Sequence, residues 1–293
     1  MTKILLIGSN GQVGAELQQA LRSYPELITV SRPQIDLYQP EKLRELITAI
    51  KPHVVINAAA YTAVDRAESE ADLAELGNAI APQYIAQACA EIGAYLIHLS
   101  TDYVFDGTSS QPYPETASTN PLSTYGSTKL AGEIAIQTHC PKHLILRTAW
   151  VYGSYGKTNF VKTMLRLGKE REVIKVVYDQ IGGPTWAGDL AAAIQQLIPQ
   201  LTPEMAGIYH YTNSGVCSWY DFAIAIFAEA KLLGFPLQIK EVLPITTSEY
   251  PTPAHRPGYS VLSCTKIRPY LGSHPPYWRD SLTKMLSVLS KYA

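Results

Sequence analysis

The feature that most constrains this sequence is a glycine-rich turn directly after its first apolar run. Lys3–Ile7 is short and apolar, and a turn with glycines at positions 8, 11 and 14 separates it from a segment with helical spacing. Such glycines allow a tight turn, let a pyrophosphate approach the backbone, and let helix and strand pack closely. The helix N-terminus would then present unpaired N–H groups to the phosphates. The turn therefore predicts a dinucleotide site, and the alternative is an ordinary tight strand–helix turn. Its expected cofactor residues are Gly8, Gly11, Gln12, Val13 and Gly14.

Short apolar runs alternate with helical spacing throughout the first half of the chain. The expected strands after Lys3–Ile7 are Leu27–Val30, Val54–Ile56, Tyr95–Leu99 and Leu144–Leu146. The expected helices are Pro40–Ile50, Asp72–Ile92 and Thr124–Gln137. Buried strands separated by helices are typical of a parallel sheet covered on both faces. The pattern predicts an α/β fold, a Rossmann-type doubly wound parallel sheet with a smaller, mainly C-terminal substrate-binding domain.

The second half is less regular, and its boundary with the first half near residue 150 is soft. We expect residues 1–150 to form the dinucleotide-binding domain, segments near 186–213 to return to it, and residues 151–293 to form mainly the substrate-binding domain. The segments expected there are a helix at Asn159–Leu167, a strand at Val173–Val177, a helix capped by Thr185 and ending at Ile198, a strand at Ile208–Thr212, a helix at Trp219–Leu233, and a long Pro-rich loop at Leu243–Pro257.

Composition excludes several classes of protein. The 293 residues are 46% hydrophobic and 17% charged, with a net charge of -1. High apolar content and low net charge exclude disorder, and the lack of excess basic residues argues against nucleic-acid binding. No stretch approaches the ~18 apolar residues of a membrane span. The cysteines at 89, 140, 217 and 264 lie far apart, as expected for reduced thiols in a cytoplasmic protein.

The end of the second expected strand bears on cofactor choice. An acidic residue there would bind the adenosine ribose hydroxyls of NAD, but the chain has Ser31 and Arg32. An Arg can hold a 2′-phosphate through charge-assisted hydrogen bonds, so the sequence favours NADPH, with NADH as the alternative. Arg32 could instead be a solvated surface residue. Asp36 and Leu37 follow where a carboxylate could meet the adenine amino group.

Two further segments carry polar groups suited to carbonyl reduction. Tyr125 and Lys129 are four residues apart on an expected helix and therefore share one face. A nearby ammonium lowers the pKa of a phenol, which can then protonate the alkoxide formed by hydride transfer. Thr101 follows an expected strand, where its hydroxyl could polarise the same carbonyl. The segment Asn57–Thr62 adds small and polar residues at another strand end, which leaves room for a ligand.

Together these motifs resemble the dTDP-4-dehydrorhamnose reductase family, within the extended short-chain dehydrogenase/reductases. The resemblance covers nearly the whole chain. It rests on Gly11–Gly14, Asn57–Glu68, Ser100–Phe105, Tyr125–Gly132, Arg147–Gly153, Phe160–Arg171 and Asp179–Thr185. It implies NADPH-dependent reduction of the C4 ketone of dTDP-4-dehydro-L-rhamnose, the last step of dTDP-L-rhamnose synthesis, with NADH used by some members.

The resemblance also implies a role for individual residues. Gly11, Gln12 and Val13 would contact the cofactor pyrophosphate region, and Asp36 and Leu37 the adenine. Tyr125 would be the proton donor, and Lys129 its partner and a ligand of the nicotinamide ribose. The positions implied beside ribose and nicotinamide are Ala60, Tyr61 and Thr62, and those implied at the sugar substrate are Thr101, Asp102 and Trp150. Trp150 could equally seal the junction between domains.

The chain departs from the family pattern near its C-terminus. Relatives place Asn and Asp where this chain has Tyr259 and Ser263, whereas Arg256 is retained and could bind the nucleotide diphosphate. Some members require Mg²⁺ and form homodimers, but no metal-ligand spacing is visible here. The acidic run Asp65, Glu68 and Glu70 is interpreted as a solvated helix start. Two alternatives stay open: reduction of another nucleotide-linked 4-keto-6-deoxysugar, and a non-catalytic, cofactor-binding regulatory subunit.

Overall fold

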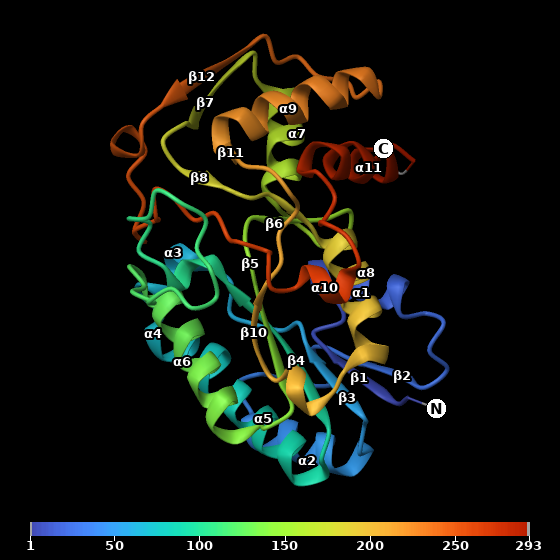
Figure 1. The fold of residues 1–293 in the computed structure, drawn as a ribbon. Coiled ribbons are helices and arrows are strands. Elements are labelled where there is room, and N and C mark those ends of the chain that lie inside the picture. The colour runs from blue at the N-terminus through green and yellow to red at the C-terminus, as the bar shows by residue number, and fades with distance from the viewer. Residues whose placement is uncertain (1, 292–293) are drawn as a thin grey trace.

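A six-stranded parallel sheet forms the centre of the lower part of the molecule in a computed structural model that describes residues 2–291 (Figure 1). The strand order is β10-β5-β4-β3-β1-β2, and every pair in it is parallel. The expected doubly wound Rossmann-type sheet is therefore confirmed. Its strands are β1 (Ile4–Ile7), β2 (Leu27–Val30), β3 (Val54–Asn57), β4 (Tyr95–Thr101), β5 (His143–Thr148) and β10 (Gly207–His210).

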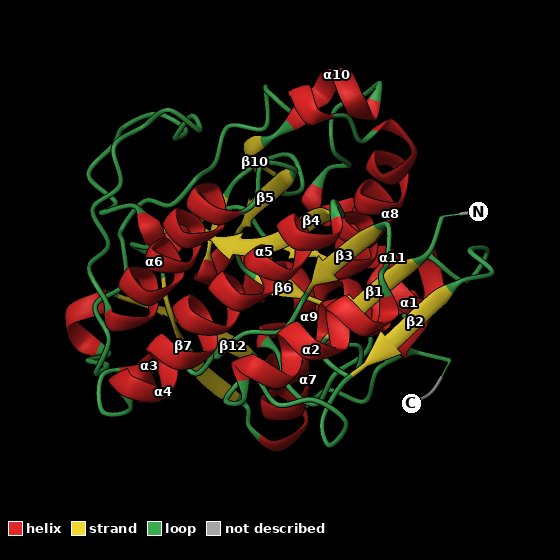
Figure 2. Cartoon of the chain, turned by 90° about the horizontal axis from the view of Figure 1, so that it is seen from below, coloured by secondary structure: helices red, strands yellow, loops and turns green. Residues whose placement is uncertain are grey.

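Helices cover both faces of this sheet (Figure 2). Ile4 and Leu6 of β1 pack into one core cluster, whereas Leu5 and Ile7 pack into the cluster on the opposite face. Because alternate side chains of a strand point to opposite faces, four consecutive apolar residues bury both sides. The first face is covered by α1 (Gln12–Ala20), α8 (Ala187–Leu197) and α10 (Arg268–Leu271). The second is covered by α2 (Pro40–Ile50), α5 (Ala81–Ile92) and α6 (Thr124–His139).

The upper part of the molecule has its own core. Its helices α7 (Phe160–Glu170), α9 (Trp219–Leu232) and α11 (Trp278–Leu289) pack around Phe222, Ile226 and Leu282, which are fully buried. Strands β7 (Val173–Val177) and β12 (Glu241–Ile245) pair in parallel at the top in Figure 1. The remaining strands are β6 (Val151–Tyr152), β8 (Ile181–Gly182), β9 (Thr185–Trp186) and β11 (Cys217–Ser218).

Three expectations for individual elements were wrong. Thr185 does not cap α8; it lies in β9, and Trp186 is the N-cap residue. The expected helix Asp72–Ile92 is divided by a π-helical turn, η1 (Leu76–Ile80), between α4 (Ala71–Glu75) and α5. The expected loop Leu243–Pro257 begins in β12, because Pro244 can occupy a strand with only one partner. The short helices α3 (Val64–Ala67), η2 (Asp102–Val104), η3 (Ile198–Gln200), η4 (Pro203–Met205) and η5 (Thr247–Glu249) complete the fold.

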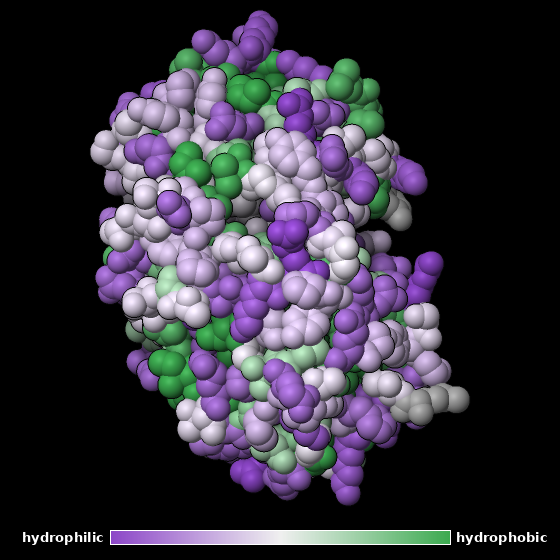
Figure 3. Space-filling model, viewed as in Figure 1, coloured by the Kyte–Doolittle hydropathy of each residue, from purple (hydrophilic) through white to green (hydrophobic). Residues whose placement is uncertain are grey.

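Within residues 2–291, no helix has both the length and the apolar character needed to cross a bilayer. Figure 3 shows hydrophobic residues on one face as small separate groups among polar ones. The four cysteines are free thiols; Cys89, Cys140 and Cys217 are buried, and Cys264 is half-buried.

Candidate active site

A cavity of about 800 Å³ lies along the carboxyl ends of β1, β3, β4 and β5. This is the edge at which open parallel sheets bind ligands. Its charged lining residues are Arg32, Lys129 and Lys157 against a single carboxylate, Asp102, among the described residues. The cavity is therefore suited to an anionic ligand although the whole chain is nearly neutral.

The glycine turn closes one end of this cavity. Gly8 has a φ of +85°, and a Cβ on Gly14 would lie 2.1 Å from the Gly8 carbonyl oxygen. Gly11 is the N-cap residue of α1, and a glycine has no side chain to accept from the first-turn N–H groups. Gln12 and Val13 of this uncapped turn line the cavity, as expected of an anion site at a helix N-terminus. Gly8, Gly11, Gln12 and Val13 line the cavity, whereas Gly14 serves the contact between turn and helix.

The end of β2 forms a second part of the lining. Ser31, Arg32 and Leu37 line the cavity, but Asp36 does not. The Arg32 side chain is 68% exposed, lies 3.9 Å from Asp36 and stacks over the Tyr38 ring. This weak, exposed pair leaves the guanidinium available to a ligand. No acidic side chain lines the cavity at this strand end in the described part of the chain.

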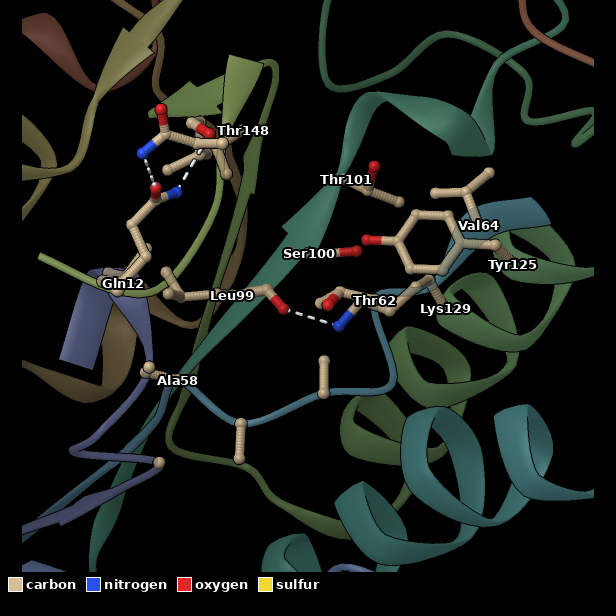
Figure 4. Close-up of a pocket in the computed structure, with 18 of the residues that line it drawn as sticks. Gln12, Ala58, Thr62, Val64, Leu99, Ser100, Thr101, Tyr125, Lys129 and Thr148 are labelled. Carbon is tan, nitrogen blue, oxygen red and sulfur yellow. Dashed lines mark hydrogen bonds between the residues drawn. The ribbon is translucent and has the colours of Figure 1, made fainter. Parts of the chain in front are cut away.

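The polar groups expected for reduction meet on the other side of the cavity. Figure 4 shows the Tyr125 phenol, the Thr101 hydroxyl and the Lys129 amine gathered there, away from Gln12. Ser123 accepts from the Gly126 N–H and begins α6, which places Tyr125 in the first helical turn. Lys129 lies one turn later, and its Nζ donates to the Leu99 carbonyl at 2.7 Å. The side-chain arrangement predicted from the four-residue spacing is thus present.

The electrostatics of this group differ from the expectation that Lys129 lowers the pKa of Tyr125. Burial raises the pKa of Tyr125 to about 12, and the Thr101 hydroxyl opposes that shift. Burial also lowers the pKa of Lys129 to about 8, against the attraction of Glu133. The expected lowering of the phenol pKa by the ammonium is therefore not seen: burial is the largest effect on Tyr125, and the charge of Asp102 raises its pKa further.

Thr101 and Asp102 form a short hydrogen-bonded unit at the end of β4. The Thr101 hydroxyl accepts from the Tyr103 N–H at 3.2 Å and donates to Asp102 Oδ1 at 3.1 Å. Burial raises the pKa of Asp102 to about 6, although hydrogen bonds from Ser260 and Thr101 lower it. To donate to a substrate carbonyl, the Thr101 hydroxyl must turn away from Asp102.

Comparison with known proteins identifies the family. A family model described as the RmlD substrate binding domain matches residues 1–291. The dTDP-4-dehydrorhamnose reductase of Escherichia coli K12 is 46% identical over 292 residues, covering 98% of this chain and 97% of that protein. The chain belongs to the dTDP-4-dehydrorhamnose reductase family.

Solved structures of dTDP-4-dehydrorhamnose reductases agree with this assignment. That of Clostridium acetobutylicum has a TM-score of 0.91 and 41% identity, covering 98% of this chain and 99% of its own. That of Bacillus anthracis, in complex with NADP, has a TM-score of 0.91 and 40% identity, covering 98% of this chain and all of its own. The UDP-glucose 4-epimerase of Thermus thermophilus, at 19% identity and a TM-score of 0.81, shares the fold.

Trp150 lies both at the cavity and against the upper core, the two places considered for it from the sequence. It lines the cavity, and its ring stacks on Trp219 with centroids 3.5 Å apart. Its φ of 47° is unusual for a non-glycine residue. One side of the ring is therefore part of the upper core, while the residue still faces the cavity.

Three other expected site residues do not line the cavity of this reductase-family chain. Gly14 and Asp36 were described above, and the Tyr61 side chain instead donates its hydroxyl to Glu70 at 2.6 Å. Ala60 and Thr62 on either side of Tyr61 do line the cavity. The backbone segment is thus at the site, while the phenol of Tyr61 points to α3 and α4.

Arg256 is also outside the lining and is held by an acidic residue. Its Nη2 donates to Asp65 at 2.9 Å, and Asp65 also accepts from the Ala254 N–H. The expected contact of Arg256 with the nucleotide diphosphate stays a prediction. The tail residues Tyr259 and Ser263 lie outside the lining as well: backbone bonds join this tail to Ile181 and Tyr113. The two departures from the family pattern therefore lie outside the lining, although Ser260 between them hydrogen-bonds the lining residue Asp102.

The acidic run lies at a helix start with exposed or half-buried carboxylates, as interpreted, since Asp65 is in the first turn of α3, but the same carboxylates also bind other segments. Asp65 binds Arg256, and Glu68 accepts from the backbone and hydroxyl of Thr124, which begins α6. Glu70 accepts from Tyr61. These carboxylates join α3 and α4 to α6 and the C-terminal tail. Within residues 2–291, no group of three or more His, Cys, Asp or Glu side chains is arranged to hold a metal ion.

Sequence reasoning missed the contribution of the segment between β6 and α7. Gly156, Lys157, Thr158 and Asn159 line the cavity beside the glycine turn. Asn159 caps α7 and donates to the Gln12 side chain at 2.7 Å. The signal available in the sequence was Lys157 among small and polar residues just before a helix, but it lies at no fixed spacing from the glycine turn.

Proposed function

We propose that the chain reduces the C4 ketone of dTDP-4-dehydro-L-rhamnose to dTDP-L-rhamnose with NADPH. The observation that carries this proposal is the meeting of Tyr125, Thr101 and Lys129 in the same cavity as the glycine turn. Membership of the family and the name of the Escherichia coli relative support the sugar substrate. The NADP bound to the Bacillus anthracis relative supports the cofactor.

The residues at the cavity edge fit a dinucleotide phosphate. Gly8 and Gly11 have no side chain to keep a diphosphate away from the backbone. Gly8 also has no room for one, since a Cβ there would lie 2.8 Å from the Ala59 backbone nitrogen. The Thr148 hydroxyl is buried and lines the cavity with no partner among residues 2–291, as expected where a bound ligand supplies one. Ser31 and Arg32 would hold the 2′-phosphate. The remaining proposed cofactor residues are Gln12, Val13, Leu37, Ala60, Thr62 and Lys129.

When bound, NADPH supplies the hydride, and residues of this chain supply the proton. Tyr125 would donate its phenolic proton to the C4 oxygen, and Thr101 would hydrogen-bond the same oxygen. Lys129 would stabilise the resulting phenolate by its charge. Asp102 would accept a hydrogen bond from a sugar hydroxyl, and Trp150 would pack against the sugar nucleotide.

We propose that residues 1–150, with the returning α8 and β10, hold the cofactor, while most of 151–293 shapes the sugar-nucleotide pocket. The pairing of β10 with β5 and the separate upper core support this division. A cytoplasmic location is proposed from the composition and the free cysteines, and a homodimer from the family resemblance. Analytical ultracentrifugation of the purified chain tests the homodimer: a monomer at micromolar concentration rejects it.

A coupled assay tests the reaction and the cofactor preference together. Purified chain is mixed with dTDP-4-dehydro-L-rhamnose, and the oxidation of NADPH and of NADH is followed at 340 nm in parallel. We expect faster oxidation of NADPH at low concentration. The Arg32→Ala variant should lose about tenfold or more of this preference, since a charge-assisted bond contributes about 1.5–3 kcal/mol. An unchanged ratio of the two kcat/KM values rejects the role of Arg32.

A further inference from the structure

A buried histidine, His98, lies directly behind the amine of Lys129. His98 is on β4 and only 1% exposed, and its register partner on β3 is Asn57, which is equally buried. The ring touches a nitrogen on each side: His98 Nδ1 lies 3.1 Å from Asn57 Nδ2, and His98 Nε2 lies 3.2 Å from Lys129 Nζ. Neither residue is needed for the proposed reduction as described above.

The hydrogen positions in this chain follow from counting donors and acceptors. The Ala59 N–H donates to Asn57 Oδ1 at 3.1 Å, which fixes the amide so that its NH₂ group faces His98. His98 Nδ1 must therefore accept a hydrogen bond. A neutral imidazole with an accepting Nδ1 carries its proton on Nε2, and burial lowers the pKa of His98 well below its ordinary value. The resulting Nε2–H points at Lys129.

An ammonium and an N–H facing each other are two donors without an acceptor. The amine form of Lys129 has no such conflict: it donates to Leu99, accepts from His98 through its lone pair, and keeps one N–H for the cavity. Flipping the Asn57 amide would only move the conflict to the Ala59 N–H. With Lys129 charged, one buried donor therefore faces another in either arrangement.

We propose that Asn57 and His98 form a positioning pair that destabilises the charged form of Lys129 in the cofactor-free site. An anionic ligand in the cavity favours the ammonium, so its binding draws a proton from solvent onto Lys129. The titratable groups around Lys129 are His98 on β4, Tyr125 and Glu133 on α6, and Arg147 on β5, which pairs with Glu133. Only the use of this proton in the reaction rests on the proposed function.

The first test reads the tautomer of the intact chain without ligand or mutation. Side-chain ¹⁵N NMR of histidine-labelled protein distinguishes the two neutral tautomers and the imidazolium. The His98 signals are assigned by their loss in His98→Gln. We expect the Nε2–H tautomer throughout pH 6–9. An Nδ1–H tautomer or an imidazolium at neutral pH overturns the proposal.

The second test measures the charge of Lys129 in the same ligand-free chain. The ¹³Cε shift of Lys129, assigned with Lys129→Met, is followed with pH in the wild type, in His98→Gln and in a control, His143→Gln. Glutamine offers an oxygen to the amine, so His98→Gln should raise the pKa of Lys129 by a unit or more. His143 is the first residue of β5, at the end of the strand opposite the cavity, so His143→Gln should leave the pKa of Lys129 unchanged. Equal values in His98→Gln and the control overturn the proposal. Because no substrate is present, these outcomes are independent of whether the sugar is reduced.

Discussion

The Glu133–Arg147 ion pair behind the site allows a stability prediction with a defined magnitude. Glu133 on α6 is fully buried, and the Arg147 side chain on β5 is 3% exposed. Arg147 Nε and Nη2 donate to the carboxylate, the latter at 2.6 Å, and the Ser100 hydroxyl donates to it as well. Glu133→Gln would leave the guanidinium buried without a counter-charge.

Removing one partner of a buried ion pair costs about 3–5 kcal/mol. At about 2.1 cal/mol/K of unfolding entropy per residue, a chain of this length loses roughly 5–8 °C in Tm. The control is Glu170→Gln, which breaks the exposed i,i+4 pair with Arg166. Exposed pairs contribute about 0–1 kcal/mol, so its Tm should fall by less than about 2 °C.

Thermal unfolding followed by circular dichroism measures both variants. A third variant, Glu133→Gln with Arg147→Met, removes both charges and should recover most of the loss, because a buried pair can be replaced by apolar residues at little cost. Equal Tm shifts for Glu133→Gln and Glu170→Gln would show that the buried pair stabilises the fold no more than the exposed one. A double variant less stable than Glu133→Gln would also contradict the prediction, because packing and not the unpaired charge would then dominate.

Three further outcomes are expected. Tyr125→Phe should lower kcat by about 10²- to 10⁴-fold, as for loss of a general acid, with cofactor affinity unchanged by fluorescence titration; unaltered turnover excludes the proton role. Gly14→Ala should abolish cofactor binding in the same titration, because its Cβ would lie 2.1 Å from the Gly8 oxygen; wild-type affinity contradicts the tight-turn account. Asp102 has a folded-state pKa of about 6, above its unfolded value, so its contribution is full at low pH and is lost as pH rises from 4 to 6. Relative to the wild type, Asp102→Asn should therefore gain up to roughly 3 kcal/mol in urea unfolding between pH 4 and pH 7; a pH-independent difference is the contrary result.

The sheet was predictable because its strands are buried on both faces. The runs ending at Ile7 and Ile56 are apolar and fully buried in β1 and β3, and the structure reproduces their ends within one residue. Pro40 and Ile50 likewise mark α2 at both ends. The upper part was less predictable, since two-residue strands such as β6 and β8 leave no periodic pattern.

The site was predictable where its residues lie within one strand–helix unit. Tyr125 and Lys129 share a helix, and the glycine turn is a continuous segment. What the sequence could not indicate were contacts between distant segments. The partners His98 and Lys129, and Arg256 and Asp65, meet only through tertiary packing. The pKa of Tyr125 was misjudged for the same reason, because its burial depends on the whole cavity wall.

The most direct test of the central claim is deuterium transfer to the sugar. The chain is incubated with dTDP-4-dehydro-L-rhamnose and NADPH deuterated at the transferring position of the nicotinamide, and the product is analysed by ¹H NMR. We expect one deuterium, at C4 of dTDP-L-rhamnose, and transfer slowed by about 10²-fold or more in Tyr125→Phe. Deuterium at another carbon, or no transfer by the wild-type chain, would contradict it.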